Sequence, residues 1–273
     1  MAVLKIGSAE FERRYREKAK DLLDLASGLS DRPVPGEIHD LRVTARRIQV
    51  MRRLLPKSVR ALQTSKRFDL LLKSMLNRTS QLRDLDTLMS TLKEHSSSLP
   101  RELLVGLENQ RSDAAARAKA ACDVLVDSPP PDVDPSEISG RTLSRRLRKR
   151  ARKHRRATAE LLSGVLQDES KVEELHSLRI EVKKLRYLLE LPEKTPRELP
   201  TVTRWQDSLG AIHDMDVALR FLDEKDVELK GWALVDLRRS RHQAYLKFVG
   251  ESRADSIETV GDGSSLIGSA FSA

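Results

Sequence analysis

Apolar residues recur at helical spacing along almost the whole chain. In the segment after the first proline cluster, Leu41, Ala45, Ile48 and Met51 lie three or four positions apart, which places them on one face of a helix. Leu, Arg, Ala, Lys and Glu are frequent, whereas the alternation of β-branched residues that indicates strands is scarce. The pattern therefore predicts an all-α protein.

Prolines and a change in composition divide the helical pattern into parts. The sharpest break, at 127–139, holds four prolines and four acidic residues but no Lys or Arg. It predicts an acidic, Pro-rich linker between a first helical bundle at 8–126 and a second at 140–249. Residues 250–273 are small and polar, and they predict a flexible tail.

Two short motifs occur twice, in the same order. Residues 38–43 (IHDLRV) recur as 175–180 (LHSLRI), and residues 82–86 (LRDLD) recur as 212–216 (IHDMD). Paired motifs in register indicate an internal duplication. Each copy has room for about four helices, which is enough for one bundle.

The motif that contains a histidine places cations on the polar face of each predicted helix. At about 100° per residue, the cations of the first copy fall within roughly 60° of its histidine, and the second copy repeats this arrangement. Leu, Ile, Ala and Met occupy the opposite face. The two basic stripes consist of His39, Arg42, Arg46 and Arg53 in the first copy, and of His176, Arg179 and Lys183, with Arg186 at the edge, in the second.

A third basic stripe lies just after the predicted linker. Residues 141–156 contain ten Lys or Arg and no acid. Arg145, Arg148 and Arg152 lie on one face of this predicted helix and are assigned to the same anion site. Like charges one turn apart destabilise a helix. An anion bound along the stripe would offset this repulsion, whereas a face exposed only to solvent would keep it. The stripe therefore favours a polyanion as ligand.

The overall charge agrees with a polyanionic partner. Lys and Arg number 50 against 41 Asp and Glu, which gives a net charge of +9. Aromatic residues make up only 4%, which argues against base stacking, and no nucleic-acid-binding motif is present. We expect recognition of phosphate groups alone. One cysteine, no signal peptide and no apolar segment of membrane length predict a cytoplasmic protein.

The repeated histidines and acids are the other candidates for chemistry. His39 and His176 occupy equal places in the two copies and could donate hydrogen bonds to phosphate oxygens. The acids of the second motif predict partners that orient the arginines of the stripes, with Mg²⁺ binding as the weaker interpretation. These acids are Asp84, Asp86, Asp214 and Asp216. We predict no metal site, no cofactor and no catalysis.

These motifs together resemble the CHAD family, the conserved histidine α-helical domain. The first half carries His39-x-x-Arg42-Val43-x-x-Arg46-Arg47, followed by Arg83-Asp84-x-Asp86. The second half carries His176-x-x-Arg179-Ile180-x-x-Lys183-Lys184-x-Arg186-Tyr187, followed by Leu209-Gly210-x-x-His213-Asp214-x-Asp216. The resemblance covers roughly residues 8 to 249.

The resemblance implies two four-helix bundles related by a pseudo-twofold, with a basic groove between them that binds inorganic polyphosphate. It adds Arg47 and Lys184 to the groove residues of the two stripes. One departure is Gln49, which stands where the family usually has a basic residue, as Arg186 is in the second copy. We therefore expect a stand-alone, non-catalytic polyphosphate-binding protein, with polyphosphate granules as a destination.

Three other functions fit the sequence less well. The first is a helical protein that binds the backbone of nucleic acids, which the charge permits but the few aromatic residues disfavour. The second is an enzyme acting on phosphoanhydrides, with Mg²⁺ on the paired aspartates. The third is an interaction module whose basic face meets acidic proteins.

Overall fold

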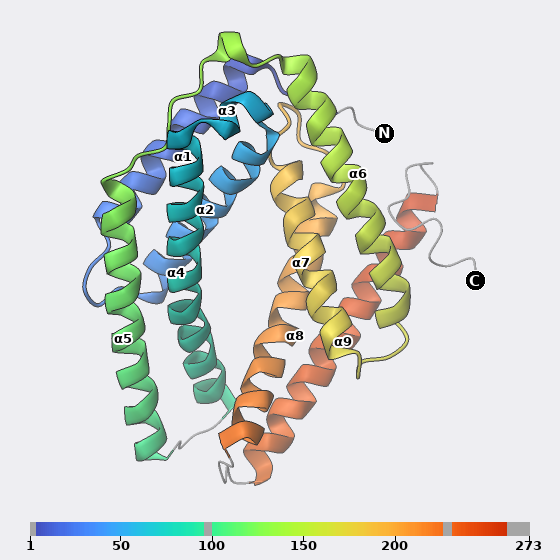
Figure 1. Cartoon of the computed structure of the whole chain (residues 1–273). Helices are drawn as coiled ribbons and strands as arrows, with labels where there is room; N and C mark the ends of the chain where they lie inside the picture. The colour runs from blue at the N-terminus through green and yellow to red at the C-terminus, as the bar shows by residue number, and fades with distance from the viewer. Residues whose placement is uncertain (1–3, 96–99, 226–230, 261–273) are drawn as a thin grey trace. The chain divides into compact units, whose positions relative to one another are not determined.

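The computed structural model describes residues 4–95, 100–225 and 231–260. The regular elements of these residues are all helical (Figure 1), which confirms the all-α prediction. The α-helices are α1 (Ser8–Ser27), α2 (Pro35–Leu54), α3 (Lys57–Ala61), α4 (Gln63–His95), α5 (Arg101–Val126), α6 (Gly140–Val165), α7 (Val172–Leu189), α8 (Leu199–Lys225) and α9 (Gly231–Val260), and one 3₁₀ helix, η1, spans Pro135–Glu137. None of the helices in this described part is both long and apolar enough to cross a membrane.

The chain divides into two compact units. The N-terminal unit comprises Ile6–Ser90 and Ser98–Arg146, and the C-terminal unit comprises Met1–Lys5, Thr91–Ser97 and Leu147–Ala273. The boundaries of the units thus fall within α4 and α6 and not in the predicted linker. Each unit is described separately below.

The segment predicted as a linker belongs to the N-terminal unit. Val133 and Ile138 are buried, and η1 between them packs against α1. The carboxylate of Asp134 accepts a hydrogen bond of 2.7 Å from the backbone N–H of Ser136, which begins the 3₁₀ turn. The prolines follow the end of α5, as expected. Val133 and Ile138 nevertheless hold the segment against the bundle because the burial of their side chains is favourable.

The core of the N-terminal unit forms where α1 meets α2 and α5. The apolar positions of α2 that were predicted to face the core, including Leu41 and Ile48, are fully buried. A buried cation was not predicted. Arg52 is only 1% exposed, and its guanidinium bonds to Asp69, to the hydroxyl of Tyr15 at 3.0 Å and to a backbone carbonyl. Arg52 is therefore a structural residue, unlike the adjacent Arg53, which is exposed.

The core of the C-terminal unit forms between α7, α8 and α9. The apolar face predicted for α7, with Leu178, Val182 and Leu185, is buried. Trp205 of α8 and Phe248 of α9 meet edge to face with ring centroids 6.4 Å apart. These contacts direct the opposite face of α7, which carries His176, away from the core.

The last helix is longer than the sequence predicted. The tail was expected from residue 250, but α9 continues to Val260. Asp255 is buried and accepts a hydrogen bond of 2.9 Å from the indole Nε1–H of Trp205. Ser208 of α8 donates to Glu251 at 2.7 Å. These polar contacts to α8 extend the helix, and residues 261–273 lie outside the described part.

We predict that Asp255→Ala lowers the free energy of unfolding by about 1.5–3 kcal/mol, because it leaves the buried indole N–H of Trp205 without its charged acceptor. Thermal denaturation followed by circular dichroism measures the change. Arg253→Ala, an exposed position on the same helix, is the matched control and should melt like the wild type. Equal melting temperatures for all three proteins would contradict this role of Asp255.

Candidate anion-binding site

The basic face of α2 begins at a well-defined helix start. Pro35 is the first residue of the helix, and the carboxylate of Glu37 accepts a hydrogen bond of 2.7 Å from the backbone N–H of Val34. This start places His39 in the exposed first part of the helix. Arg53 is exposed near its end.

Arg42 joins α2 to α4. Its guanidinium donates to the backbone carbonyl of Leu76 at 2.7 Å and to the hydroxyls of Thr79 and Ser80 at 3.0 and 3.3 Å. The hydroxyl of Ser80 in turn makes a long hydrogen bond of 3.5 Å to Asp84. Arg42 therefore has a structural role in addition to its predicted role as an anion ligand, and Asp84 acts on it through Ser80.

The next cations of the α2 stripe are half-buried. Arg46 donates from Nη1 to Oε1 of Gln49 at 3.0 Å. Gln49 thus stands where a basic residue was expected, and it forms a hydrogen bond with an arginine of the stripe. Arg47 is also half-buried, on the flank that the helical spacing predicted.

The basic face of α7 meets a histidine of α8. His176 and His213 approach each other with their Nδ1 atoms 3.1 Å apart and their ring centroids 4.6 Å apart. Both rings are half-buried. Arg179 and Lys183, one and two turns after His176, lie near enough to act on the charge of His213. The structure thus brings together His176, Arg179 and Lys183 as predicted, and it adds His213.

The charge around these histidines is strongly positive. Burial, followed by the charges of Arg179, His176, Arg220 and Lys183, lowers the pKa of His213 from 6.5 to about 4. His213 is therefore neutral near pH 7. Burial alone would lower the pKa of a histidine, but Arg179, Arg220 and Lys183 act in the same direction, which places three cations around His213 in the C-terminal unit.

Lys184 and Arg186 lie in a different environment from the cations around His213. Lys184 binds Glu181 at 2.6 Å and lines a groove of about 560 Å³ between α6 and α7. It lies about 140° around the helix from Arg179, so the two side chains face different surroundings. Arg186 donates to Glu190 at 3.0 Å, one turn further on. Both cations are neutralised by carboxylates of their own helix, which weakens their assignment to an anion site.

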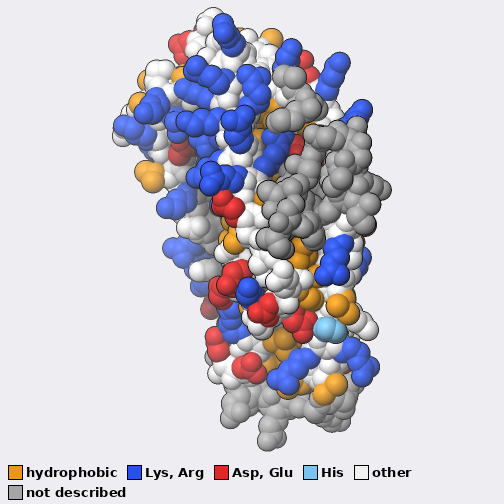
Figure 2. All heavy atoms as spheres, turned by 90° about the vertical axis from the view of Figure 1, so that its right-hand side faces the viewer, with side chains coloured by type: hydrophobic (Ala, Val, Ile, Leu, Met, Phe, Trp, Pro, Cys, Tyr) orange, Lys and Arg blue, Asp and Glu red, His pale blue; other side chains and the backbone are white. Residues whose placement is uncertain are grey.

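The predicted cations of α6 are exposed. Arg145, Arg148 and Arg152 lie on the face of α6 opposite to its buried residues, and Figure 2 looks onto the side of the molecule that carries this helix, where Lys and Arg side chains gather. His154 and Ala157 of α6 face α7 instead, with His154 at 2.6 Å from Glu181.

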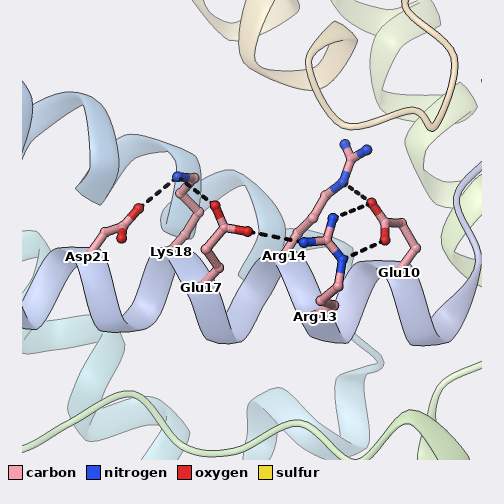
Figure 3. A network of polar contacts seen from close by, with 6 residues as sticks. All are labelled: Glu10, Arg13, Arg14, Glu17, Lys18 and Asp21. Carbon is pink, nitrogen blue, oxygen red and sulfur yellow. Dashed lines mark hydrogen bonds and ion pairs between the residues drawn. The ribbon is translucent and has the colours of Figure 1, made fainter.

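Helix α1 shows how this chain arranges charge where no anion is expected. Glu10 binds both Arg13 and Arg14, and Lys18 binds Glu17 and Asp21 (Figure 3). Those of the pairs that lie one turn apart, Glu10 with Arg13 and Arg14 and Lys18 with Asp21, stabilise an isolated helix slightly. The exposed cations of α6 differ from them, because neither Arg145 nor Arg152 has an acidic partner among the residues that the structure describes.

Two arginine–aspartate pairs position the helices that carry the histidines. In the N-terminal unit, Nε of Arg111 donates to Asp86 at 2.7 Å, and its Nη2 donates to the carbonyl of Pro33 at 2.6 Å. Pro33 lies two residues before α2. The contact therefore ties the start of the His39 helix to α4 and α5, and we refer to it as the first Arg–Asp clasp.

The C-terminal unit contains the same arrangement. Nε of Arg241 donates to Asp216 at 2.9 Å, and its Nη2 donates to the carbonyl of Glu169 at 2.8 Å. Glu169 lies three residues before α7. This second Arg–Asp clasp uses residues 130 positions after Arg111 and Asp86, which is the offset between the two copies of the second motif.

The clasps correct the predicted role of two acids. Asp86 and Asp216 were expected to orient the arginines of the stripes, but they bind arginines of α5 and α9. The reason is that both acids lie on the buried sides of α4 and α8, where the last helix of each half packs. Burial raises the pKa of Asp216, and the hydrogen bond from Arg241 opposes this shift.

Sequence reasoning did not assign His213, Arg111 or Arg241 to a site. His213 lies in the second repeated motif, and Arg111 and Arg241 are 130 positions apart, which is the offset of that motif; this shared offset was the available signal. In the described part of the chain, no group of three or more His, Cys, Asp or Glu side chains could hold a metal ion. The paired aspartates of the first motif contact different partners, Asp84 the hydroxyl of Ser80 and Asp86 the guanidinium of Arg111.

Comparisons with known proteins agree with this fold. The sequence model of the CHAD domain matches residues 13–223. A comparison with curated proteins finds no match. Among solved structures, the crystal structure of the CHAD domain from the plant Ricinus communis is similar with a TM-score of 0.51 and 17% identity, over 89% of this chain and 87% of that chain. Because the matched segment spans well over half of the sequence, the chain belongs to the CHAD family.

Proposed function

We propose that this protein binds inorganic polyphosphate through the basic faces of α2 and α7 and does not transform it. The observation that carries the proposal is the contact of His176 with His213, whose Nδ1 atoms are 3.1 Å apart, beside Arg179 and Lys183 of the same face. Burial first, and these cations second, lower the pKa of His213 to about 4. A polyphosphate chain, which carries a negative charge on each unit, would neutralise these cations. Membership of the CHAD family supports the same ligand.

The second basic face supports an extended ligand. His39, Arg42 and Arg46 follow one another along α2 at a spacing of three or four residues, so that their side chains repeat along one face of the helix. Arginine and lysine recognise phosphate by charge and hydrogen bonds and need no base or sugar. Binding of a bare phosphate chain requires nothing further, and docking on polyphosphate granules would follow from it.

A competition titration tests the ligand class. Labelled long-chain polyphosphate is bound at about 0.15 M salt, near physiological ionic strength, and challenged with unlabelled polyphosphate, tRNA, single-stranded DNA and duplex DNA at equal phosphate concentration. We expect only polyphosphate to compete well. Equal competition by the nucleic acids would instead favour a general phosphate-backbone binder, for which the unpaired exposed cations of α6 are the specific support.

Charge-removal variants test the site. We predict that Arg179→Ala combined with Lys183→Ala weakens polyphosphate binding by about a hundredfold to ten-thousandfold, since each lost charge-assisted contact is worth about 1.5–3 kcal/mol. The matched control removes two exposed cations of α9, Arg238 and Arg239, by the same substitution. Circular dichroism confirms that both variants keep their helices. Equal loss of affinity in the two variants would show that net charge, and not the α7 face, determines binding.

The absence of catalysis is tested separately. We expect no release of orthophosphate from polyphosphate, with or without Mg²⁺. Release that is lost in Asp84→Asn or Asp214→Asn would support the alternative enzyme on phosphoanhydrides. A protein that binds and does not hydrolyse fits the contacts of Asp86 and Asp216, which are occupied by the two Arg–Asp clasps.

A further inference from the structure

His176 and His213 form a pair whose geometry limits its protonation. Their Nδ1 atoms are 3.1 Å apart, which is hydrogen-bonding distance. At most one of these two nitrogens can carry a proton, because two N–H groups would point at each other. The observed contact is therefore compatible with a neutral pair or with a pair that carries one extra proton, but not with two imidazolium ions.

The pair has no acidic partner, unlike other histidines of this chain. His95 contacts Asp236, His154 contacts Glu181, and His242 contacts Glu169. Among the described residues, His176 and His213 form a hydrogen bond with each other and no ion pair with an acid. A positive charge on the pair would therefore lack a counter-ion from the protein.

The groups that face the pair are cations or are already engaged. Helix α7 contributes Arg179 and Lys183, and α8 contributes Arg220. Arg220 also binds Glu173 at 3.2 Å. Helix α9, which packs on α8, carries Arg241, whose guanidinium is held by Asp216 and Glu169 in the second Arg–Asp clasp and is not among the charges that act on His213.

We propose that His176 and His213 together form an anion subsite that takes up one proton from solution when a phosphate oxyanion binds. The free pair holds two protons, one shared between the Nδ1 atoms and one on an Nε2 atom. The bound pair holds three, with the shared proton retained and both Nε2 atoms protonated. It then carries one positive charge and offers two N–H donors to the phosphate oxygens. This inference rests on the proposed function, because the anion is a unit of the polyphosphate chain.

The electrostatics agree with this cycle. The pKa of His213 is lowered to about 4 by burial and by its cationic neighbours, which keeps His213 neutral at pH 7 in the absence of ligand. A bound phosphate offsets those cations and raises the proton affinity of the pair. Linkage then requires binding to tighten as the pH falls, by up to about tenfold per pH unit while one proton is taken up.

The first copy of the motif lacks the second histidine of this subsite. Arg83 occupies the position that corresponds to His213, 130 residues earlier. An arginine remains charged at all relevant pH values. We therefore expect the proton-linked part of binding to belong to the C-terminal unit alone.

Isothermal titration calorimetry tests the inference. Long-chain polyphosphate, in which titratable chain ends are few, is added at about pH 6.5 in buffers that differ in ionisation enthalpy, and the dependence of the heat on the buffer gives the number of protons taken up. We expect up to one proton more for the wild type than for His213→Gln, which should still bind through Arg179 and Lys183. His242→Gln, at an exposed position, is the matched control and should behave like the wild type.

A second measurement follows the rings directly. Proton NMR of the imidazole groups should show the apparent pKa of His213 rising from about 4 when polyphosphate is added. Binding with the same proton uptake in the wild type and in His213→Gln, together with an unchanged histidine titration, would overturn the subsite and leave the proposed function intact. Failure of the wild type to bind polyphosphate at any of these pH values would overturn both.

Discussion

A fourfold increase in salt concentration should weaken polyphosphate binding by on the order of a thousandfold or more. A site that contacts about eight phosphates, treated like a single-stranded nucleic acid, releases enough counter-ions to give a slope of about −6 in a plot of log K against log salt. Fluorescence titrations between about 0.05 and 0.2 M salt, the range over which such slopes are determined, measure it.

The same titration separates the α7 face from the rest of the charge. Loss of Arg179 and Lys183 should reduce the steepness of the slope by about 1.4, because each lost phosphate contact removes about 0.7. Loss of Arg238 and Arg239, which lie exposed on α9, should leave it unchanged. A slope near zero in the wild type would contradict the electrostatic mechanism, since no other described feature of the site would hold a polyphosphate chain.

The largest effect on stability is expected from Asp216→Ala. This change leaves the buried guanidinium of Arg241, which is 8% exposed, without the carboxylate that binds it at 2.9 Å. Breaking a buried ion pair costs about 3–5 kcal/mol. Arg241 keeps its contacts with Glu169, so we expect a value near 3 kcal/mol, which lowers the melting temperature by about 6–12 °C in a chain of this size.

Asp207→Ala is the matched control for this prediction, because Asp207 lies exposed on the same helix. Both variants remove one carboxylate from α8, and only the first should lower the melting temperature. The variant Asp216→Ala should also weaken polyphosphate binding, since the second Arg–Asp clasp holds the backbone just before α7. A stable Asp216→Ala protein with normal affinity would show that the clasp does not position α7.

Much of the fold could be predicted from the sequence because it depends on local periodicity. The buried and exposed sides of α2 and α7 follow from the spacing of Leu, Ile and Val at three or four residues, and the structure confirms them. The error at α9 has a physical reason. Residues 250–260 are polar and small in composition, and the contact that extends the helix is a hydrogen bond between Asp255 and Trp205, 50 positions apart.

The candidate site was predictable only in part, for a related reason. Helical spacing correctly placed His176, Arg179 and Lys183 on one face. It could not show that Lys184 is neutralised by Glu181, or that Arg42 binds α4. Those outcomes depend on which long side chains reach one another, and the period of a helix does not contain that information.

The sequence by itself determined the helical class, the apolar faces, the repeated motifs and the positive charge, because each of these follows from the order of residues along a helix. The tertiary structure decided which polar groups meet. It pairs His176 with His213, and it directs Asp86 and Asp216 to Arg111 and Arg241. The physical reason is that hydrogen bonds and ion pairs act over about 3 Å, so that only the packing of helices distant in sequence determines which of them form.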